Sequence, residues 1–149
     1  MKSGKFALLR IAFGLIWAAD AFFKWQPAFA QGFVAYFTDA LQSQPPAIAA
    51  WITLWVGIVS AHPSQWAFAI ACIETAIAVG LVFGLFTRVA IIGGGVLAFL
   101  IWSLPEGFGM LWMPGMTDPG AGIIYVLVFI ALWLGESWRA YSLDAILFS

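Results

Sequence analysis

One acidic residue, Glu74, lies near the middle of an otherwise almost wholly apolar run, residues 66–86. A carboxylate at the centre of a bilayer-length segment costs several kcal/mol, roughly 2.5 to 3.5 on insertion scales, unless it faces protein or water. Residues of this kind are usually kept for function or for helix pairing. The position of Glu74 therefore predicts a membrane protein with a buried polar site, but it does not name a substrate.

Two further charges, Asp20 and Lys24, lie one helical turn apart at the end of the first apolar run. An acid and a base four residues apart on a helix are close enough to pair. At ~1.5 Å rise per residue, Asp20 lies ~6 Å from Lys24 and Glu74 lies ~12 Å from Trp66. Both acids then fall in the outer half of their helices, which predicts an outer cluster of Asp20, Lys24 and Glu74.

The chemistry of this cluster follows from its charge balance. Two acids that share one base leave an excess negative charge in a poorly solvated place, and a proton, a cation or a hydrogen-bonding ligand relieves that excess. Reduction of a quinone requires proton uptake close to its ring, so we predict that Glu74 and Asp20 exchange protons and that Lys24 balances charge. The alternative is a structural ion-pair network that holds the two helices together.

Three more candidate residues lie on the same helical faces. At 100° per residue, Arg10 and Trp17 share a stripe with Lys24, so we predict that Arg10 orients the ligand and that Trp17 forms the apolar wall. If the second helix continues beyond its apolar run, Arg88 is aligned with Glu74, which predicts a base at the inner end of that helix. For both arginines the alternative is a side chain that reaches out to lipid phosphates.

Composition excludes several classes of protein. The chain has 149 residues, of which 64% are hydrophobic and 9% are charged, whereas soluble domains carry about 25% charged residues. Its net charge of -1 leaves no basic stripe for nucleic acid. With one cysteine, Cys72, and one histidine, His62, we expect no metal site, internal disulfide or bis-histidine haem. Any electron carrier is therefore a diffusible molecule or belongs to a partner chain.

The apolar segments predict the architecture. About 20 apolar residues cross a bilayer, and the candidate spans are residues 6–23, 66–86, 89–104 and 120–138. With four spans, the positive-inside rule places both termini in the cytoplasm, on the side that holds Lys2, Lys5, Arg10, Arg88 and Arg139. We predict a single domain, an all-α integral membrane four-helix bundle. We expect a multi-pass protein of a prokaryotic inner or plasma membrane.

Residues 26–65 form a long external segment between the first two spans. Apolar side chains in residues 29–41 recur at helical spacing, which predicts a helix lying on the membrane surface. Residues 47–61 are apolar but short for a span, so we expect a re-entrant or interfacial helix, with a fifth span as the alternative. The loop of residues 105–119 is rich in Gly, Pro and Met, and we expect it to cover an opening in the bundle.

Several short motifs follow one another along most of the chain: Leu9-Arg-Ile-Ala-Phe-Gly14, Gly84-Leu-Phe-Thr-Arg88, Leu104-Pro-Glu-Gly-Phe-Gly109 and Tyr141-Ser-Leu-Asp144-Ala. Together with Trp17, Lys24 and Glu74, this pattern resembles the DoxX/DoxD family of small four-helix membrane proteins, and the third motif resembles the DoxD branch. The resemblance implies the membrane subunit of a thiosulfate:quinone oxidoreductase. Such a subunit works beside a smaller partner subunit and passes electrons to membrane quinone. The resemblance also implies that Arg10, Lys24, Glu74 and Arg88 are the family's recurring polar positions.

Two other functions stay open at the level of the sequence. The first is a non-catalytic accessory subunit that packs within a larger respiratory or other membrane complex, which suits the many aromatic and small residues. The second is a small ion or solute carrier, which predicts a water-lined path from Glu74 toward Arg88. An enclosed ligand beside Glu74 would separate the quinone-linked function from the accessory one.

Overall fold

The computed structural model describes residues 2–147, without the side chain of Lys2, and this part of the chain is helical with no strand. Its four main helices are α1 (Lys2–Lys24), α5 (Pro63–Phe83), α6 (Thr87–Ser103) and α7 (Ala121–Leu134). Three helices connect α1 to α5, namely α2 (Pro27–Gly32), α3 (Ala35–Asp39) and α4 (Pro46–Ser60). The shorter pieces are η1 (Gly107–Met110), η2 (Ser137–Arg139) and α8 (Leu143–Leu147). The predicted all-α class is confirmed.

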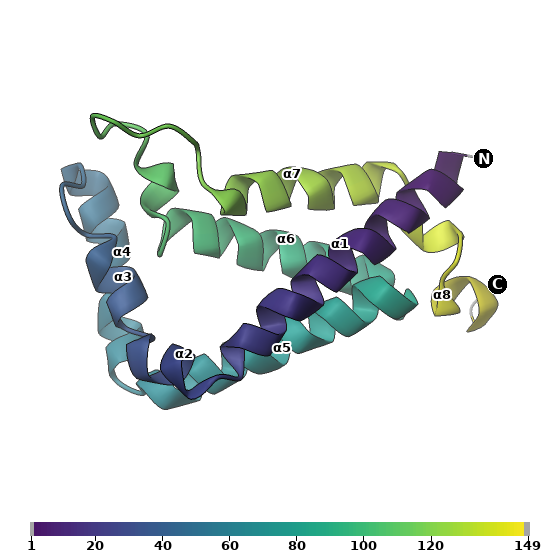
Figure 1. Cartoon of the computed structure of the whole chain (residues 1–149), viewed down its shortest axis with the longest axis horizontal. Helices are drawn as coiled ribbons and strands as arrows, with labels where there is room; N and C mark the ends of the chain where they lie inside the picture. The colour runs from purple at the N-terminus through teal and green to yellow at the C-terminus, as the bar shows by residue number, and fades with distance from the viewer. Residues whose placement is uncertain (1, 148–149) are drawn as a thin grey trace.

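The main helices pack as two pairs, α1 along α5 and α6 along α7, and a tight turn joins α5 to α6 (Figure 1). Glycines allow the close approach within each pair. A Cβ at Gly14 of α1 would lie 2.9 Å from Leu81 Cβ of α5, and a Cβ at Gly94 of α6 would collide with the ring of Phe129 in α7. The start of α1 and helix α8 lie at one end of the bundle, and α2 to α4 lie at the other.

Helix α5 ends earlier than the apolar run predicted. Gly84 adopts a left-handed conformation with φ of 66°, and its N–H donates to Gly80 O. A glycine in this conformation terminates a helix. Arg88 therefore belongs to the first turn of α6, and the prediction that it continues the helix of Glu74 is wrong. Its exposed guanidinium lies over the ring of Trp138, 4.7 Å from the centroid.

Two of the four predicted spans are long enough to cross a bilayer. Helices α1 and α5 meet the length and apolarity that a membrane crossing requires. The helices α4, α6 and α7 are apolar but have 15, 17 and 14 residues. Helix α7 is short because it ends at Gly135, before the separate turn of η2. The arrangement with four spans stays a prediction.

The segment that connects α1 to α5 folds back on itself at the end of the bundle opposite the N-terminus and α8, which we call the outer end. Residues 29–41 form two short helices, α2 and α3, in place of the single predicted helix, because helical hydrogen bonding is interrupted at Phe33 and Val34. Helices α3 and α4 cross the direction of α6 and α7 (Figure 1). The buried side chains of Phe33, Phe37 and Ile52 form a small core of their own here.

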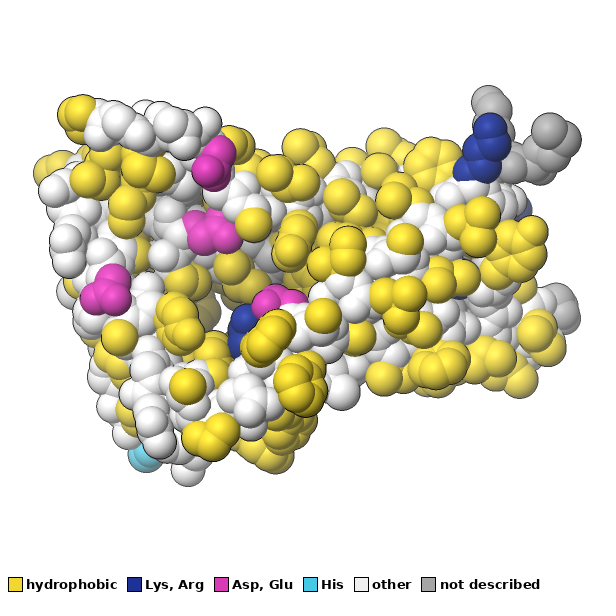
Figure 2. All heavy atoms as spheres, viewed as in Figure 1, with side chains coloured by type: hydrophobic (Ala, Val, Ile, Leu, Met, Phe, Trp, Pro, Cys, Tyr) yellow, Lys and Arg dark blue, Asp and Glu magenta, His cyan; other side chains and the backbone are white. Residues whose placement is uncertain are grey.

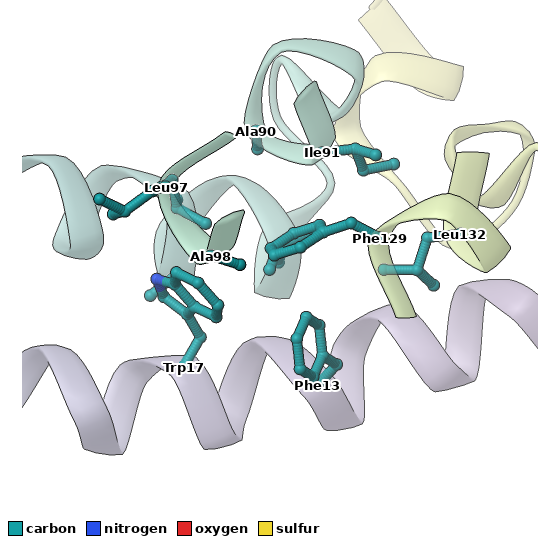
Figure 3. Packing of buried hydrophobic residues seen from close by; sticks show 11 residues of the cluster. Phe13, Trp17, Ala90, Ile91, Leu97, Ala98, Phe129 and Leu132 are labelled. Atoms are coloured by element: carbon teal, nitrogen blue, oxygen red, sulfur yellow. The ribbon is translucent and has the colours of Figure 1, made fainter. Parts of the chain in front are cut away.

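The main core lies between the two helix pairs and is built on aromatic rings. Phe13 and Trp17 of α1 point toward Phe129 of α7 (Figure 3), with ring centroids 5.1 Å and 5.2 Å away. These are edge-to-face contacts, which aromatic rings favour because of their quadrupoles. The rings fix the position of α1 against α7, and α1 carries the outer charges one to two turns beyond Trp17.

Candidate functional site

The structure brings Asp20, Lys24 and Glu74 together at the outer end of the bundle, as their helical spacing predicted. Lys24 Nζ lies 3.2 Å from Asp20 Oδ1 and 3.8 Å from Glu74 Oε2. Asp20 and Lys24 belong to the last two turns of α1, and Glu74 lies midway along α5. The packing of α1 against α5 therefore positions one ammonium group between two carboxylates.

The three charged side chains differ in their exposure. The side chain of Glu74 is 0% exposed, whereas those of Lys24 and Asp20 are 20% and 38% exposed. Among the described residues, none donates a hydrogen bond to either carboxylate oxygen of Glu74. A buried carboxylate without hydrogen bonds is energetically costly, and such sites usually have a functional reason. Lys24 and Asp20 are the exposed part of the cluster, and Glu74 lies in the wall behind them.

The cluster lines a pocket of about 790 Å³. This volume is within the roughly 300 to 1,000 Å³ of small-molecule sites. The face in Figure 2 has an opening near the outer end of the bundle, with acidic and basic atoms at its rim. Apart from its charged residues, the pocket is mainly apolar and aromatic, with side chains from every helix from α1 to α7. A mainly apolar cavity with a few polar groups at one place suits a ligand with a small polar head and an apolar body.

Part of the pocket wall is formed by the residues that follow α6 and by the start of α7. Pro105, Glu106, Gly122 and Tyr125 line the pocket. The carboxylate of Glu106 accepts hydrogen bonds of 2.9 Å and 3.1 Å from the N–H of Gly122, in the first turn of α7. A carboxylate at a helix N-terminus satisfies a free N–H group and the helix dipole. Glu106 therefore fixes the predicted cover loop to α7, and the start of that loop forms part of the wall.

Arg10 lies toward the other end of α1, in a second buried polar region. Its Nε donates to Leu81 O at 2.9 Å and its Nη1 donates to Ser137 O at 2.7 Å. Its Nη2 donates to Tyr141 O. Each nitrogen of the guanidinium therefore has a backbone carbonyl as partner, and Arg10 joins α1 to the end of α5 and to the C-terminal segment of residues 137–147.

The pocket and the predicted ligand-binding residues overlap only in part. Among the described residues that line the pocket, Lys24 is present but Arg10, Trp17 and Arg88 are not. Trp17 is fully buried in the aromatic core, and the Arg88 side chain is exposed next to Trp138. Tyr125 lines the pocket but was not predicted, although a phenol within the apolar run of residues 120–138 marks it in the sequence.

The C-terminal segment is also tied to the turn between α5 and α6. Asp144 Oδ1 accepts the N–H of Phe86 at 2.8 Å, and Asp144 Oδ2 accepts the N–H of Thr87 at 2.7 Å. Partial burial raises the pKa of this carboxyl, but the hydrogen bonds from Thr87 and Phe86 and the charge of Arg10 outweigh it, so the pKa is below its ordinary value. Asp144 supplies the cap that the first turn of α6 lacks within its own helix.

No protein-family model, curated protein or solved structure significantly matches this chain. The likeness to the DoxX/DoxD family is carried by the sequence motifs alone. The chemistry of the site therefore has to be judged from its geometry: one ammonium, two nearby carboxylates and a mainly apolar pocket.

Proposed function

We propose that this chain is a membrane subunit of a quinone-linked oxidoreductase. Support for a membrane location comes from the apolar composition and from α1 and α5, which are long enough to cross a bilayer. Large apolar side chains also cover the outside of the bundle, among them Leu8, Phe83 and Leu134, which are 61%, 58% and 76% exposed. In this proposal they face the lipid of a prokaryotic inner or plasma membrane, and both termini are cytoplasmic.

The pocket suits a quinone because its polar and apolar parts are separated. Lys24 offers an ammonium donor for a carbonyl oxygen, and the aromatic walls suit the ring and the start of an isoprenoid tail. Asp20 and Glu74 place two carboxylates beside that donor, and in this proposal they exchange protons with the bound quinone. A bound quinone supplies the capacity to accept two electrons and two protons. The observation that carries the proposal is the buried carboxylate of Glu74, which lines this pocket and has no hydrogen-bond donor among the described residues.

In this proposal the chain transfers protons to and from the quinone, and a partner subunit transfers the electrons. Glu74 is buried behind Lys24 and Asp20, whose partial exposure suits exchange of protons with the outside. The resemblance to the DoxX/DoxD family suggests thiosulfate as the electron donor and a smaller partner subunit as the electron-transferring chain. A non-catalytic packing subunit would have no need of a buried carboxylate that lines a pocket and accepts no hydrogen bond from the described residues.

Calorimetric titration of the purified protein in a non-ionic detergent with a short-chain ubiquinone tests this function. We expect saturable binding in the micromolar range, after subtraction of the titration into protein-free micelles. Lys24→Met keeps the length of the side chain but removes the donor, so we expect about a tenfold loss of affinity, as for a charge-assisted hydrogen bond of about 1.4 kcal/mol.

Arg88→Met is the matched control, because Arg88 is an exposed base that does not line the pocket among the described residues. Its affinity for the quinone should equal that of the wild type. Absence of saturable binding, or equal affinity of the Lys24→Met and Arg88→Met variants, contradicts the proposed function. Helical content measured by circular dichroism confirms that both variants are folded.

A further inference from the structure

The pocket contains more negative than positive charge. Three carboxylates, those of Asp20, Glu74 and Glu106, line it, and among the described lining residues Lys24 is the one base. Lys24 is shared between Asp20 and Glu74, and the carboxylate of Glu106 accepts the N–H of Gly122. With the three acids ionised and Lys24 protonated, the formal charge of the lining is -2, in a pocket with little polar surface to screen it.

The walls are also rich in aromatic rings, since seven of the lining residues are Phe, Tyr or Trp. The face of an aromatic ring attracts cations through its quadrupole. The protein already uses one ring in this way, because Lys24 Nζ lies over the ring of Phe29, 5.3 Å from its centroid. Phe29 and Lys24 both line the pocket, so this contact shows that its wall accepts a positive charge.

Glu74 supplies the reason for a cation to bind there. Its carboxylate is fully buried and accepts no hydrogen bond from the described residues, and the ammonium group of Lys24 lies 3.8 Å away. A second cation near this group would relieve an incompletely compensated charge. An anion would meet the surplus carboxylates and is disfavoured by the same charges.

We propose that this pocket binds lipophilic organic cations, such as aryl phosphonium or quaternary ammonium compounds, and rejects anions of equal size and shape. The volume of about 790 Å³ provides room for several aromatic groups of one ligand. Asp20 and Glu74 provide the opposite charge, and the rings of the wall provide cation–π contacts. This inference goes beyond the proposed function, because it concerns a different class of ligand and requires no electron transfer.

A pair of isosteric ions tests the proposal directly. Tetraphenylphosphonium and tetraphenylborate have the same shape and opposite charge, so a difference between them reports the electrostatics of the site. Each is titrated calorimetrically into the purified full-length protein in a non-ionic detergent, with protein-free micelles as the blank. We expect tetraphenylphosphonium to bind at least about tenfold more tightly than tetraphenylborate.

Variants then show which carboxylates cause the preference for tetraphenylphosphonium over tetraphenylborate. Asp20→Asn and Glu74→Gln each remove one carboxylate charge with little change in shape, and each should reduce the preference for the cation by about threefold to tenfold. Glu136→Gln is the matched control, because Glu136 pairs with Arg139 at 2.8 Å and does not line the pocket among the described residues. This control should keep the full preference of the wild type.

Equal affinity of the wild type for both ions, or a preference that is unchanged in both Asp20→Asn and Glu74→Gln, overturns the proposal. The short-chain ubiquinone is titrated into the same preparations. Quinone binding without cation preference overturns only this inference, and cation preference without quinone binding overturns only the proposed function.

Discussion

Arg10 and Glu74 are both 0% exposed charged residues on two helices that pack together, yet their surroundings are opposite. Every nitrogen of the Arg10 guanidinium donates to a backbone carbonyl, whereas neither oxygen of Glu74 accepts a hydrogen bond from the described residues. A buried charge with all its hydrogen bonds made stabilises one arrangement of the chain. A buried charge without them is costly to keep. The comparison separates a structural polar region from a candidate functional one.

The packing around the two residues also differs, because the chain is closely packed near Arg10 and leaves a cavity near Glu74. At the inner end, a Cβ on Gly84 would collide with Ser142, and a Cβ on Gly135 would collide with the ring of Phe6. At the outer end, the helices enclose a pocket of about 790 Å³. The inner end is therefore closed by the C-terminal segment, and the outer end leaves room for a ligand.

The largest effect on stability is expected for Arg10→Met. This change leaves the carbonyls of Leu81, Ser137 and Tyr141 without their donor, and each buried acceptor left unsatisfied costs about 1 to 3 kcal/mol. The midpoint of thermal unfolding in detergent, followed by circular dichroism, should fall by far more than in any variant of the outer cluster. A midpoint within about 2 °C of the wild type, well below the shift expected for 1 kcal/mol, would show that the network is not structural.

A smaller effect on stability is expected for a substitution at the contact between α6 and α7. Gly94→Ala places a methyl group against the ring of Phe129, and overpacking of this kind costs about 1 to 3 kcal/mol. Gly93→Ala is the matched control in the same helix, because nothing lies within 4 Å of its Cβ position. Alanine there should raise stability by up to about 1 kcal/mol, since it favours the helix. Equal midpoints of thermal unfolding for the two variants would contradict this packing.

Asp144→Asn weakens the cap that holds the C-terminal segment to the start of α6. We expect the free energy of unfolding to fall by about 1 kcal/mol, the usual cost of losing a helix cap. The pKa of Asp144 is lowered in the folded state, so its contribution to stability is present above the unfolded pKa of about 3.9 and is lost as the pH falls through the folded value. The wild-type midpoint should therefore fall more than that of the variant as the pH drops from 7 to below about 4. If the midpoints of thermal unfolding of the two proteins change in parallel with pH, Asp144 does not contribute to the loss of stability in acid.

The smallest change in stability is expected for Glu74→Gln, within about 1 kcal/mol of the wild type. The variant removes a buried charge that accepts no hydrogen bond from the described residues. Lys24 retains its ion pair with Asp20, in which Nζ lies 3.2 Å from Oδ1. Quinone reduction by the reconstituted complex should nevertheless fall about 100-fold, at the low end for loss of a general acid or base. A strongly destabilised Glu74→Gln variant with normal activity would reverse the roles assigned to Glu74 and Arg10.

Helical periodicity predicted the local relations between charges but not the tertiary ones. The spacing of Asp20 and Lys24, and the outer position of Glu74, were enough to predict that the three side chains meet. The end of α5 was missed because an apolar run does not show where Gly84 turns left-handed. The role of Arg10 was not visible either, since its partners are backbone carbonyls more than 70 residues away in the sequence.

The pocket could not be predicted from any single segment. Its wall combines side chains from seven helices, and apart from the charged residues Asp20, Lys24, Glu74 and Glu106 most of them are apolar or aromatic residues that carry no signal of a pocket in the sequence. Trp17 was predicted to lie on the same helical stripe as Lys24, but its contact with Phe129 was not predicted. That contact depends on how α7 packs against α1. Sequence patterns give faces of helices, and the packing of helices decides which faces enclose a cavity.

The most direct test is to map where a quinone binds. The purified protein is irradiated with a short-chain azidoquinone, and the labelled peptides are identified by mass spectrometry, with excess unlabelled quinone as competitor. We expect competed labels in the outer pocket, on residues 20–37 and 66–74, and none in residues 137–147. Labels that the competitor does not displace, or competed labels only around Arg10 and the C-terminal segment, would contradict a quinone site at Lys24 and Glu74.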